Sequence, residues 1–282
     1  MRIGGCVVLF NPADDVVDNI KTYLPFLGEL VIVDNSTDSS PVVSEIASMS
    51  CVRYLSMGGN MGIAAALNAG CRTLIEDGFD VVLTMDQDSK FPIDDVTQIL
   101  SRVENLLGEY ALVGLNFNTT DTTYIDEITE AKYWLTSGNF LSLYAYEKVG
   151  GFNSALFIDY VDIEFGHRLK NAGLKLCYLN NYSLTHEIGS PIEIKLPGHT
   201  FYAMNHSAIR YYYRYRNSRY LYGTDKAFYR DKYYRELLVN IPKMLLFEPN
   251  KAAKLKMIRR GLADGRRGLL GVYQEGDSKW IK

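Results

Sequence analysis

Two carboxylates, Asp86 and Asp88, lie shortly after the apolar run 79–83. This run predicts a buried strand, and residues i and i+2 of an extended segment project to the same side, so both acids can reach one object. Carboxylate oxygens are the ligands that Mg²⁺ and Mn²⁺ prefer, and these ions are commonly shared with substrate phosphates. Acids at strand ends are also ordinary turn residues or helix caps, but residues 92–95 already supply the start of the next helix. The pair therefore predicts a metal-diphosphate site.

Asp34 ends another apolar run, and His186 lies just past a predicted strand. The Asp34 carboxylate can accept hydrogen bonds from a nucleotide base or ribose, or it can close an Asx-turn with the polar residues that follow it. An imidazole at the same edge as two carboxylates can complete the coordination shell of a metal ion, although a lone histidine more often forms its hydrogen bonds with nearby groups.

Three further acids, Asp159, Asp162 and Glu164, lie in the segment FIDYVDIEF. An aspartate with a reference pKa of ~3.9 is ionised at neutral pH and can accept a hydroxyl proton late in a displacement. The alternative interpretation is structural, because acids in the first turn of a helix favour its dipole and Asp159 can cap that helix.

Predicted strands and helices alternate along the first half of the chain. Strands are expected at 2–11, 29–36, 51–56 and 79–86, and helices at 14–24, 40–48 and 61–78. Nearly continuous apolar strands in this order predict an α/β fold with a parallel sheet and helices on both faces. Ligands of such sheets bind beyond the carboxyl ends of the strands, where Asp34, Asp86 and Asp88 are expected together.

The second half is less regular. After residue 110, shorter strands and frequent glycines predict a mixed sheet, with a helix over 157–173 and a strand over 174–179. From residue 204 the chain is tyrosine-rich and basic, and it predicts helices at 204–223, 231–249 and 250–268. The expected organisation is a catalytic body of residues 1–200 and a helical C-terminal extension of residues 201–282.

Composition places the chain among ordinary soluble globular proteins, since hydrophobic residues make up 47% and charged residues 22%. The four cysteines (Cys6, Cys51, Cys71 and Cys177) stand singly without metal-ligand spacing, which predicts reduced core residues. No apolar run approaches the ~18 residues of a membrane span, and the N-terminus predicts a strand instead of a signal peptide. We therefore expect a cytoplasmic protein.

Charge is unevenly distributed. Residues 1–200 carry 12 Lys and Arg against 26 Asp and Glu, whereas residues 201–282 carry 18 against 7. The basic segment is expected to meet an anionic membrane surface or a lipid pyrophosphate. Its alternatives are ordinary surface helices and a homodimer interface. Nucleic acid is not an expected partner, because the body of the chain is acidic. The cations considered are Arg210, Arg214, Arg216, Arg219, Lys251, Lys254, Lys256, Arg259 and Arg260.

The ordered motifs of residues 3–190 resemble those of the family 2 glycosyltransferases, which have the GT-A fold. The matching segments are VVLFNP, VIVDNSTD, GGNMGIAAALNAG, LTMDQDSKF, WLTSGNFLS, YEKVGGFN, FIDYVDIEFGHRLKNAG and LTHEIG. Each is a weak signal, but their order and spacing together are specific. Within the family, the chain is most similar to bacterial rhamnosyltransferases of polysaccharide and O-antigen assembly, through DQDS, LFIDYVDIEF with Arg168, H-x-x-G at His186 and YYYRYRNSRYLY.

The resemblance implies a Rossmann-like, mostly parallel sheet flanked by helices, with a role for each motif residue. Asp162 is implied as the catalytic base, and Asp88 and His186 as residues that hold Mg²⁺ or Mn²⁺. Many relatives carry two adjacent acids where this chain has Val161 and Asp162, so Asp159 or Glu164 must supply any second charge. The residues implied in substrate binding are Asn11, Asp34, Asn60, Asp86, Gly138 and Asp159.

Two of these assignments have structural alternatives that the residues themselves leave open. Asn60 is also a candidate helix cap. Gly138 can either let the backbone approach a sugar closely or form a bulge in a strand.

The function implied is an inverting, metal-dependent transfer of a sugar in cell-surface polysaccharide biosynthesis. L-rhamnose from dTDP-rhamnose is the expected donor group, and the acceptor is a saccharide or a lipid-linked saccharide, with peripheral contact at the inner face of the membrane. The alternatives are a UDP-sugar transferase of the same family, galactosyl or N-acetylhexosaminyl, and a non-catalytic protein that binds sugar nucleotides or glycans. A sugar nucleotidyltransferase is disfavoured, because VVLFNPADD lacks a glycine-rich phosphate loop.

Overall fold

The computed structural model describes residues 1–38, 40–117, 127–131, 134–186, 192–196 and 199–275. It divides into two compact units: Met1–Asn153 with Val161–Glu187, and Ser154–Tyr160 with Ile188–Lys282. The boundary expected at residue 200 falls earlier, because the hairpin before residue 203 packs on helices of the second unit. The Phe201 and Phe247 rings of that packing lie 5.4 Å apart, centroid to centroid.

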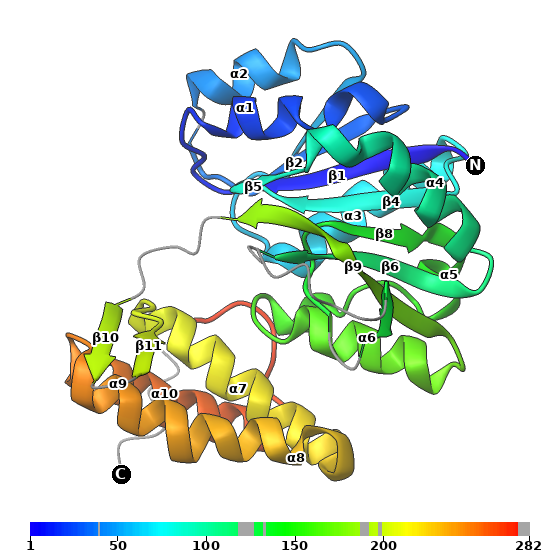
Figure 1. Ribbon diagram of the computed structural model, residues 1–282. Helices are drawn as coiled ribbons and strands as arrows, with labels where there is room; N and C mark the ends of the chain where they lie inside the picture. Colours follow the sequence, from blue (N-terminus) through cyan, green and yellow to red (C-terminus); the bar gives the residue numbers. More distant parts are fainter. Residues whose placement is uncertain (39, 118–126, 132–133, 187–191, 197–198, 276–282) are drawn as a thin grey trace. The chain divides into compact units, whose positions relative to one another are not determined.

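The sheet of the first unit begins with four parallel strands in the order β3-β2-β1-β4, which confirms the predicted parallel arrangement. It continues through β8, β6 and β9, with β8 antiparallel to both of its neighbours, so the mixed second half is also confirmed (Figure 1). Two short strands, β5 and β7, pair with β9. The strands are β1 (Ile3–Leu9), β2 (Leu30–Asp34), β3 (Val52–Ser56), β4 (Val81–Asp86), β5 (Ser89–Lys90), β6 (Tyr110–Phe117), β7 (Ile128–Glu130), β8 (Asn139–Ser142) and β9 (Lys175–His186).

Helices cover both faces of this sheet, as the strand pattern predicts. Val7 and Leu9 of β1 point into a core shared with α1 (Val16–Lys21), α2 (Pro41–Ala47) and α4 (Val96–Leu106). Because side chains alternate along a strand, Cys6 points to the other face. There its sulfur lies so close to Gly70 of α3 (Ile63–Glu76) that no Cβ would fit. Tyr146 of α5 (Leu143–Lys148) packs against Phe165 of α6 (Val161–Asn171), and its hydroxyl donates to Asn68 of α3 over 2.7 Å.

Three local expectations are corrected by the structure. The strand expected to end at residue 179 continues to His186, because β6 and β5 pair along its length. The helix expected from residue 157 begins only at Val161, because Asp159 and Tyr160 have left-handed φ angles of 62° and 68°. Asp159 therefore does not cap that helix. Cys51 is exposed in the turn before β3, so it is not a core residue.

The second unit contains α7 (Ala208–Thr224), α8 (Lys226–Arg235), α9 (Ile241–Phe247) and α10 (Lys251–Arg267), with a π-helical turn, Glu236–Asn240, between α8 and α9. A hairpin of β10 (Ile192–Leu196) and β11 (His199–Ala203) precedes them. Figure 1 shows α7 and α10 side by side. No helix within the described part of the chain is long and apolar enough to cross a membrane.

Several cations of this unit are internal, contrary to the expectation that they face an anionic partner. Arg214 donates to Glu236 over 2.8 and 2.9 Å, and Lys254 donates to Glu248 over 2.7 Å. Arg216 is 1% exposed and donates to the Leu156 carbonyl over 2.8 Å. Residues 154–160 belong to the second unit because side chains of α7 donate hydrogen bonds to their carbonyl groups.

We expect Gly261→Ala to destabilise the helical unit, although alanine is favoured over glycine in a helix by about 1 kcal/mol. A Cβ at Gly261 would collide with the Tyr212 carbonyl oxygen of α7 and lie 3.0 Å from the Arg216 amide nitrogen. Both are backbone atoms, so α7 and α10 would have to separate. Urea unfolding should show a loss of about 1–3 kcal/mol in the free energy of unfolding.

Gly223→Ala is the matched control for this measurement. Gly223 lies in α7, the helix on which α10 packs, but the nearest atom to its added Cβ is the end of the Arg219 side chain, 3.8 Å away. This variant should keep or gain stability. Equal losses in the two variants would contradict the packing argument.

Candidate functional site

The strand register brings Asp34 and Asp86 to one edge of the sheet. Strand β1 pairs with both neighbours, with Leu9 opposite Asp34 and Val8 opposite Asp86. One strand therefore separates the two acids, which places their Cα atoms roughly 10 Å apart at the usual strand spacing. Their common position at the carboxyl ends of the parallel strands confirms the predicted edge.

Asp88 lies where two non-adjacent parts of the chain meet. The next residue, Ser89, pairs with His186 at the end of β9. The sequence places these residues almost a hundred positions apart, and only the β5–β9 pairing brings their backbones together. The structure thus brings the backbones of the two candidate metal-binding positions close together, with Asp88 directly before β5 and His186 at the end of β9.

Gln87, between the two acids, anchors this edge and was not identified from the sequence. Its Oε1 accepts from the Phe10 amide over 2.8 Å, and its Nε2 donates to the Phe10 carbonyl over 3.3 Å. The Gln87 carbonyl in turn accepts from the Asn19 side-chain amide over 2.8 Å. Gln87 thus holds the ends of β1 and β4 together. The sequence signal that could have identified it is an amide side chain between two acids.

Asp34 is buried, with 3% of its surface exposed. Its Oδ1 accepts from the Ser36 amide over 2.9 Å, which is the Asx-turn considered from the sequence, and its Oδ2 accepts from the Tyr54 hydroxyl over 3.0 Å. Burial and the hydrogen bond to Asp34 raise the pKa of Tyr54. Each carboxylate oxygen can accept more than one hydrogen bond, so a turn role and a nucleotide-binding role are compatible.

Asparagines connect the loops beyond this edge. Asn11 has a left-handed φ of 46°, and its amide donates to the Ser36 hydroxyl over 2.8 Å. Asn60 is exposed, and its Oδ1 accepts from the Gly62 amide over 3.0 Å, so it supports the start of α3 without being its cap residue. Asn35, not identified from the sequence, is buried and donates to the Gly62 carbonyl over 3.1 Å.

The segment before β8 approaches Asp86 through Ser137. The Ser137 hydroxyl accepts from the Asp86 amide and donates to the Ser89 hydroxyl, both over 2.9 Å, and both serines are fully buried. Gly138 has a φ of 70°, and a Cβ there would collide with the Leu184 side chain. Close packing therefore accounts for this glycine, and its contact with a sugar stays a prediction.

Asp162 lies in the first turn of α6, and its Oδ1 accepts from the Ile163 amide over 2.8 Å. Burial raises the pKa of Tyr178 to about 12, and the charge of Asp162 contributes in the same direction. The Tyr178 hydroxyl also accepts from the Leu135 amide over 3.1 Å. Residues 135–138 therefore connect the surroundings of Asp162 to the end of β4.

The other two acids of this segment are engaged in ion pairs. Glu164 is buried and accepts two hydrogen bonds from Arg168, over 2.7 and 2.8 Å. Asp159, in the second unit, pairs with Arg210 over 3.3 Å. Glu164 and Asp159 are thus each bound to an arginine of their own unit.

Aromatic packing holds α6 in place. The Phe165 ring lies 4.3 Å from Phe152 and 5.7 Å from Trp134, centroid to centroid. Trp134 also packs so closely on Gly166 that no Cβ would fit between them. A rigidly packed helix is the kind of element that fixes the position of a functional side chain.

The described residues contain no group of three or more His, Cys, Asp and Glu side chains arranged to hold a metal ion. Mg²⁺ is usually bound through one or two carboxylates together with substrate phosphates and water, and not by a complete cage of protein ligands. Asp86 and Asp88, both partly exposed at the ends of the strands, fit this manner of binding. His186 is placed by its strand register alone.

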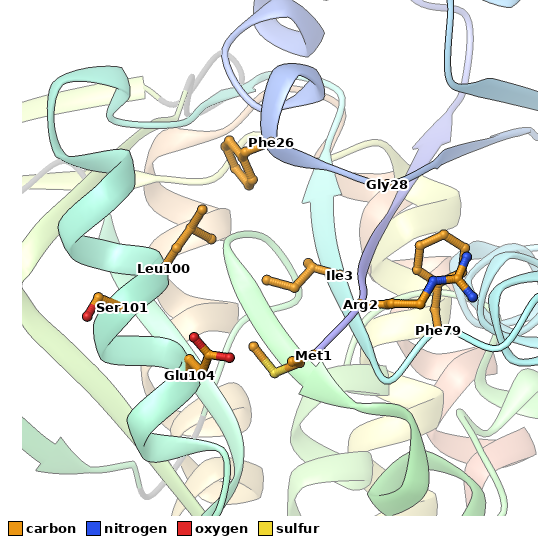
Figure 2. A pocket seen from close by; sticks show the side chains of 9 residues that line it. All are labelled: Met1, Arg2, Ile3, Phe26, Gly28, Phe79, Leu100, Ser101 and Glu104. Carbon is orange, nitrogen blue, oxygen red and sulfur yellow. The ribbon is translucent and has the colours of Figure 1, made fainter.

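A cavity of about 520 Å³ lies at the opposite end of the strands (Figure 2). The start of β1 and the turn before β4 line this cavity, whereas the candidate acids lie at the other ends of the strands, where β2 and β4 finish. Its position excludes it as part of the same site. The lining residues are Met1, Arg2, Ile3, Phe26, Gly28, Phe79, Leu100, Ser101 and Glu104.

Comparison with known sequences matches residues 12–154 to the family described as Glycosyl transferase family 2. The chain is also similar to the dTDP-rhamnosyl transferase RfbF of Shigella flexneri, with 27% identity over 241 residues, which cover 77% of this chain and 78% of RfbF.

Two solved structures share the fold of this chain. S. aureus TarS 1–349 in complex with UDP-GlcNAc is 12% identical, with a TM-score of 0.54, and the match covers 95% of this chain and 73% of TarS 1–349. GalNAc-T7 with UDP, GalNAc and Mn²⁺ is 11% identical, with a TM-score of 0.53, over 66% of this chain. The match covers 43% of the GalNAc-T7 chain, so this chain corresponds to less than half of its length. At these identities the likeness confirms the expected fold class.

Proposed function

This chain belongs to glycosyl transferase family 2 and is a glycosyltransferase, and from that premise we propose that it transfers L-rhamnose from dTDP-rhamnose to a saccharide or lipid-linked saccharide. The similarity to a dTDP-rhamnosyl transferase over most of both chains is the observation that carries the choice of donor. Transfer of this kind belongs to the assembly of cell-surface polysaccharides.

The proposed reaction is a single displacement. The Asp162 carboxylate accepts the proton of an acceptor hydroxyl as that oxygen attacks the anomeric carbon of the donor sugar. A carbon–oxygen bond forms there, the bond to the diphosphate oxygen breaks on the opposite face, and the configuration inverts. Asp162 has the charge that this step needs, since an aspartate is ionised at neutral pH.

Residues at the sheet edge are proposed to bind the donor. Asp34 would accept hydrogen bonds from the base or ribose, with Asn11 and Asn60 in the loops beside it. Asp86 would face the ribose or diphosphate, and Gly138 would lie near the sugar. The spacing of one strand between Asp34 and Asp86 suits a ligand that extends along the edge.

Asp88, with His186, is proposed to hold Mg²⁺ or Mn²⁺. When bound, such an ion neutralises the negative charge of the leaving diphosphate. The Gln87 bonds to Phe10 serve this arrangement by keeping Asp86 and Asp88 at the strand end.

Calorimetric titration with dTDP, UDP and GDP, each with Mg²⁺ and with chelator, tests this proposal. We expect binding of dTDP that depends on the metal and is tighter than binding of the other two. The methyl group that distinguishes thymine from uracil should contribute about 10- to 200-fold to this preference, and UDP also carries a ribose 2′-hydroxyl that dTDP lacks.

Each outcome of the titration has a distinct meaning. A preference for UDP would contradict the rhamnose donor and favour a UDP-sugar transferase of the same family. Binding without turnover of dTDP-rhamnose on any saccharide acceptor would favour a non-catalytic sugar-nucleotide protein. Absence of nucleotide binding under all conditions would exclude the donor site described here.

A further inference from the structure

The second unit has large exposed apolar side chains on α8, α9, the turn between them and β11, and we call this set the apolar face. Leu238 is 71% exposed and Leu246 is 68% exposed, values that are unusual for leucines of a folded helix. Single exposed leucines need no explanation, but a cluster of large apolar residues indicates an interaction site. The apolar face consists of Tyr202, Tyr234, Leu238, Val239, Leu246 and Phe247.

Two buried residues on the opposite side of the helix, Glu236 and Met244, act as anchors that leave these leucines exposed to solvent. Glu236 is 5% exposed and accepts hydrogen bonds from Arg214 and Asn240, and Met244 is fully buried. Side chains two positions apart on a helix point in nearly opposite directions. Leu238 and Leu246 each follow an anchor by two positions, so both are directed away from the interior.

Strand β11 extends the same surface. Lys243 of α9 donates to the Tyr202 carbonyl over 2.8 Å, and the Phe201 ring contacts the Phe247 ring. Tyr202 itself is 51% exposed. The strand bonded to α9 therefore adds an exposed amphipathic aromatic residue, a type that is common where a protein meets the boundary between lipid and water.

The surroundings of the apolar face are basic. Lys226, Arg230 and Arg235 are exposed along the same helical stretch, while its acids are the exposed Asp231 and the buried Glu236. A second copy of this chain docked through a twofold axis would bring the same cations near one another. An anionic lipid surface would instead complement both the charge and the apolar side chains.

We propose that the apolar face is a membrane-binding surface for anionic phospholipid. The stretch from α8 to α9 would lie in the plane of the interface, with Leu238 and Leu246 inserted below the headgroups and Arg235 on the phosphates. This assignment is independent of the proposed sugar donor. It also differs from the sequence expectation, because Arg214, Arg216 and Lys254 are internal.

Cosedimentation of the full chain with vesicles tests the proposal. The protein should bind vesicles that contain phosphatidylglycerol in phosphatidylcholine, bind pure phosphatidylcholine less, and be released in part by high salt. The double variant Leu238→Glu/Leu246→Glu should bind the anionic vesicles at least about tenfold more weakly, because two charges would enter the apolar layer.

The matched control is Tyr144→Glu/Val272→Glu, which makes the same change of charge at two exposed apolar positions outside the apolar face. It should bind vesicles as the wild type does, and both variants should keep the wild-type unfolding temperature. Absence of vesicle binding by the wild type, or equal losses in the two variants, would overturn the proposal. A wild-type dimer that becomes monomeric in the leucine variant, with vesicle binding unchanged, would identify the face as a contact between copies.

Discussion

Asp162→Asn should lower kcat of sugar transfer by about 10²- to 10⁴-fold while leaving nucleotide affinity nearly unchanged. The amide cannot accept the acceptor proton, but it is the same size, and its oxygen can still accept from the Ile163 amide. Loss of the negative charge from the first turn of α6 should cost at most about 1 kcal/mol of stability. Initial rates at saturating donor, together with nucleotide titration, measure the two effects separately.

Glu164→Gln is the control for this first prediction. Glu164 lies in the same turn, but its charge is used by Arg168, which also donates to the carbonyls of Val149 and Gly151. This variant should lose about 1–3 kcal/mol of stability, because a charged hydrogen-bond pair is weakened, and should keep its kcat per folded molecule. If Asp162→Asn retained more than a tenth of the wild-type kcat, Asp162 could not be the base.

The second large effect is expected for Asp88→Asn, which should lower kcat/KM by about 10³-fold and remove the effect of Mg²⁺ on nucleotide affinity. Stabilisation of charge on the leaving diphosphate is worth several kcal/mol, and each 1.36 kcal/mol corresponds to a factor of ten. The isosteric amide keeps the turn into β5 but loses the charge. Titration of nucleotide with and without Mg²⁺ detects the loss without any acceptor.

Asp94→Asn is a suitable comparison, because Asp94 is an exposed acid six positions further along in a short helical turn. It should retain both the metal effect and the activity. Retention of the Mg²⁺ effect in Asp88→Asn would contradict the metal-binding role of Asp88 and leave the acid at a strand end with a structural role.

The sequence alone determined the arrangement of the first sheet half and the edge where its acids gather. Apolar runs and helical periodicity are local signals, and parallel strands that follow one another through helices end on the same side of the sheet, so the sequence by itself places Asp34 and Asp86 at one edge. The motif order also identified the family, because several weak motifs at consistent spacing become specific in combination. The roles of individual site residues stay predictions, to be tested as above.

Tertiary structure decided everything that depends on a partner distant in the chain. Gln87 bonds Phe10, β5 pairs with the end of β9, and Arg214 is neutralised by Glu236, although none of these pairs is adjacent in sequence. A basic, tyrosine-rich segment looks the same whether its cations face solvent or lie inside. Which side chains are buried depends on how the helices pack. In this packing Arg216 is buried and Leu238 is exposed.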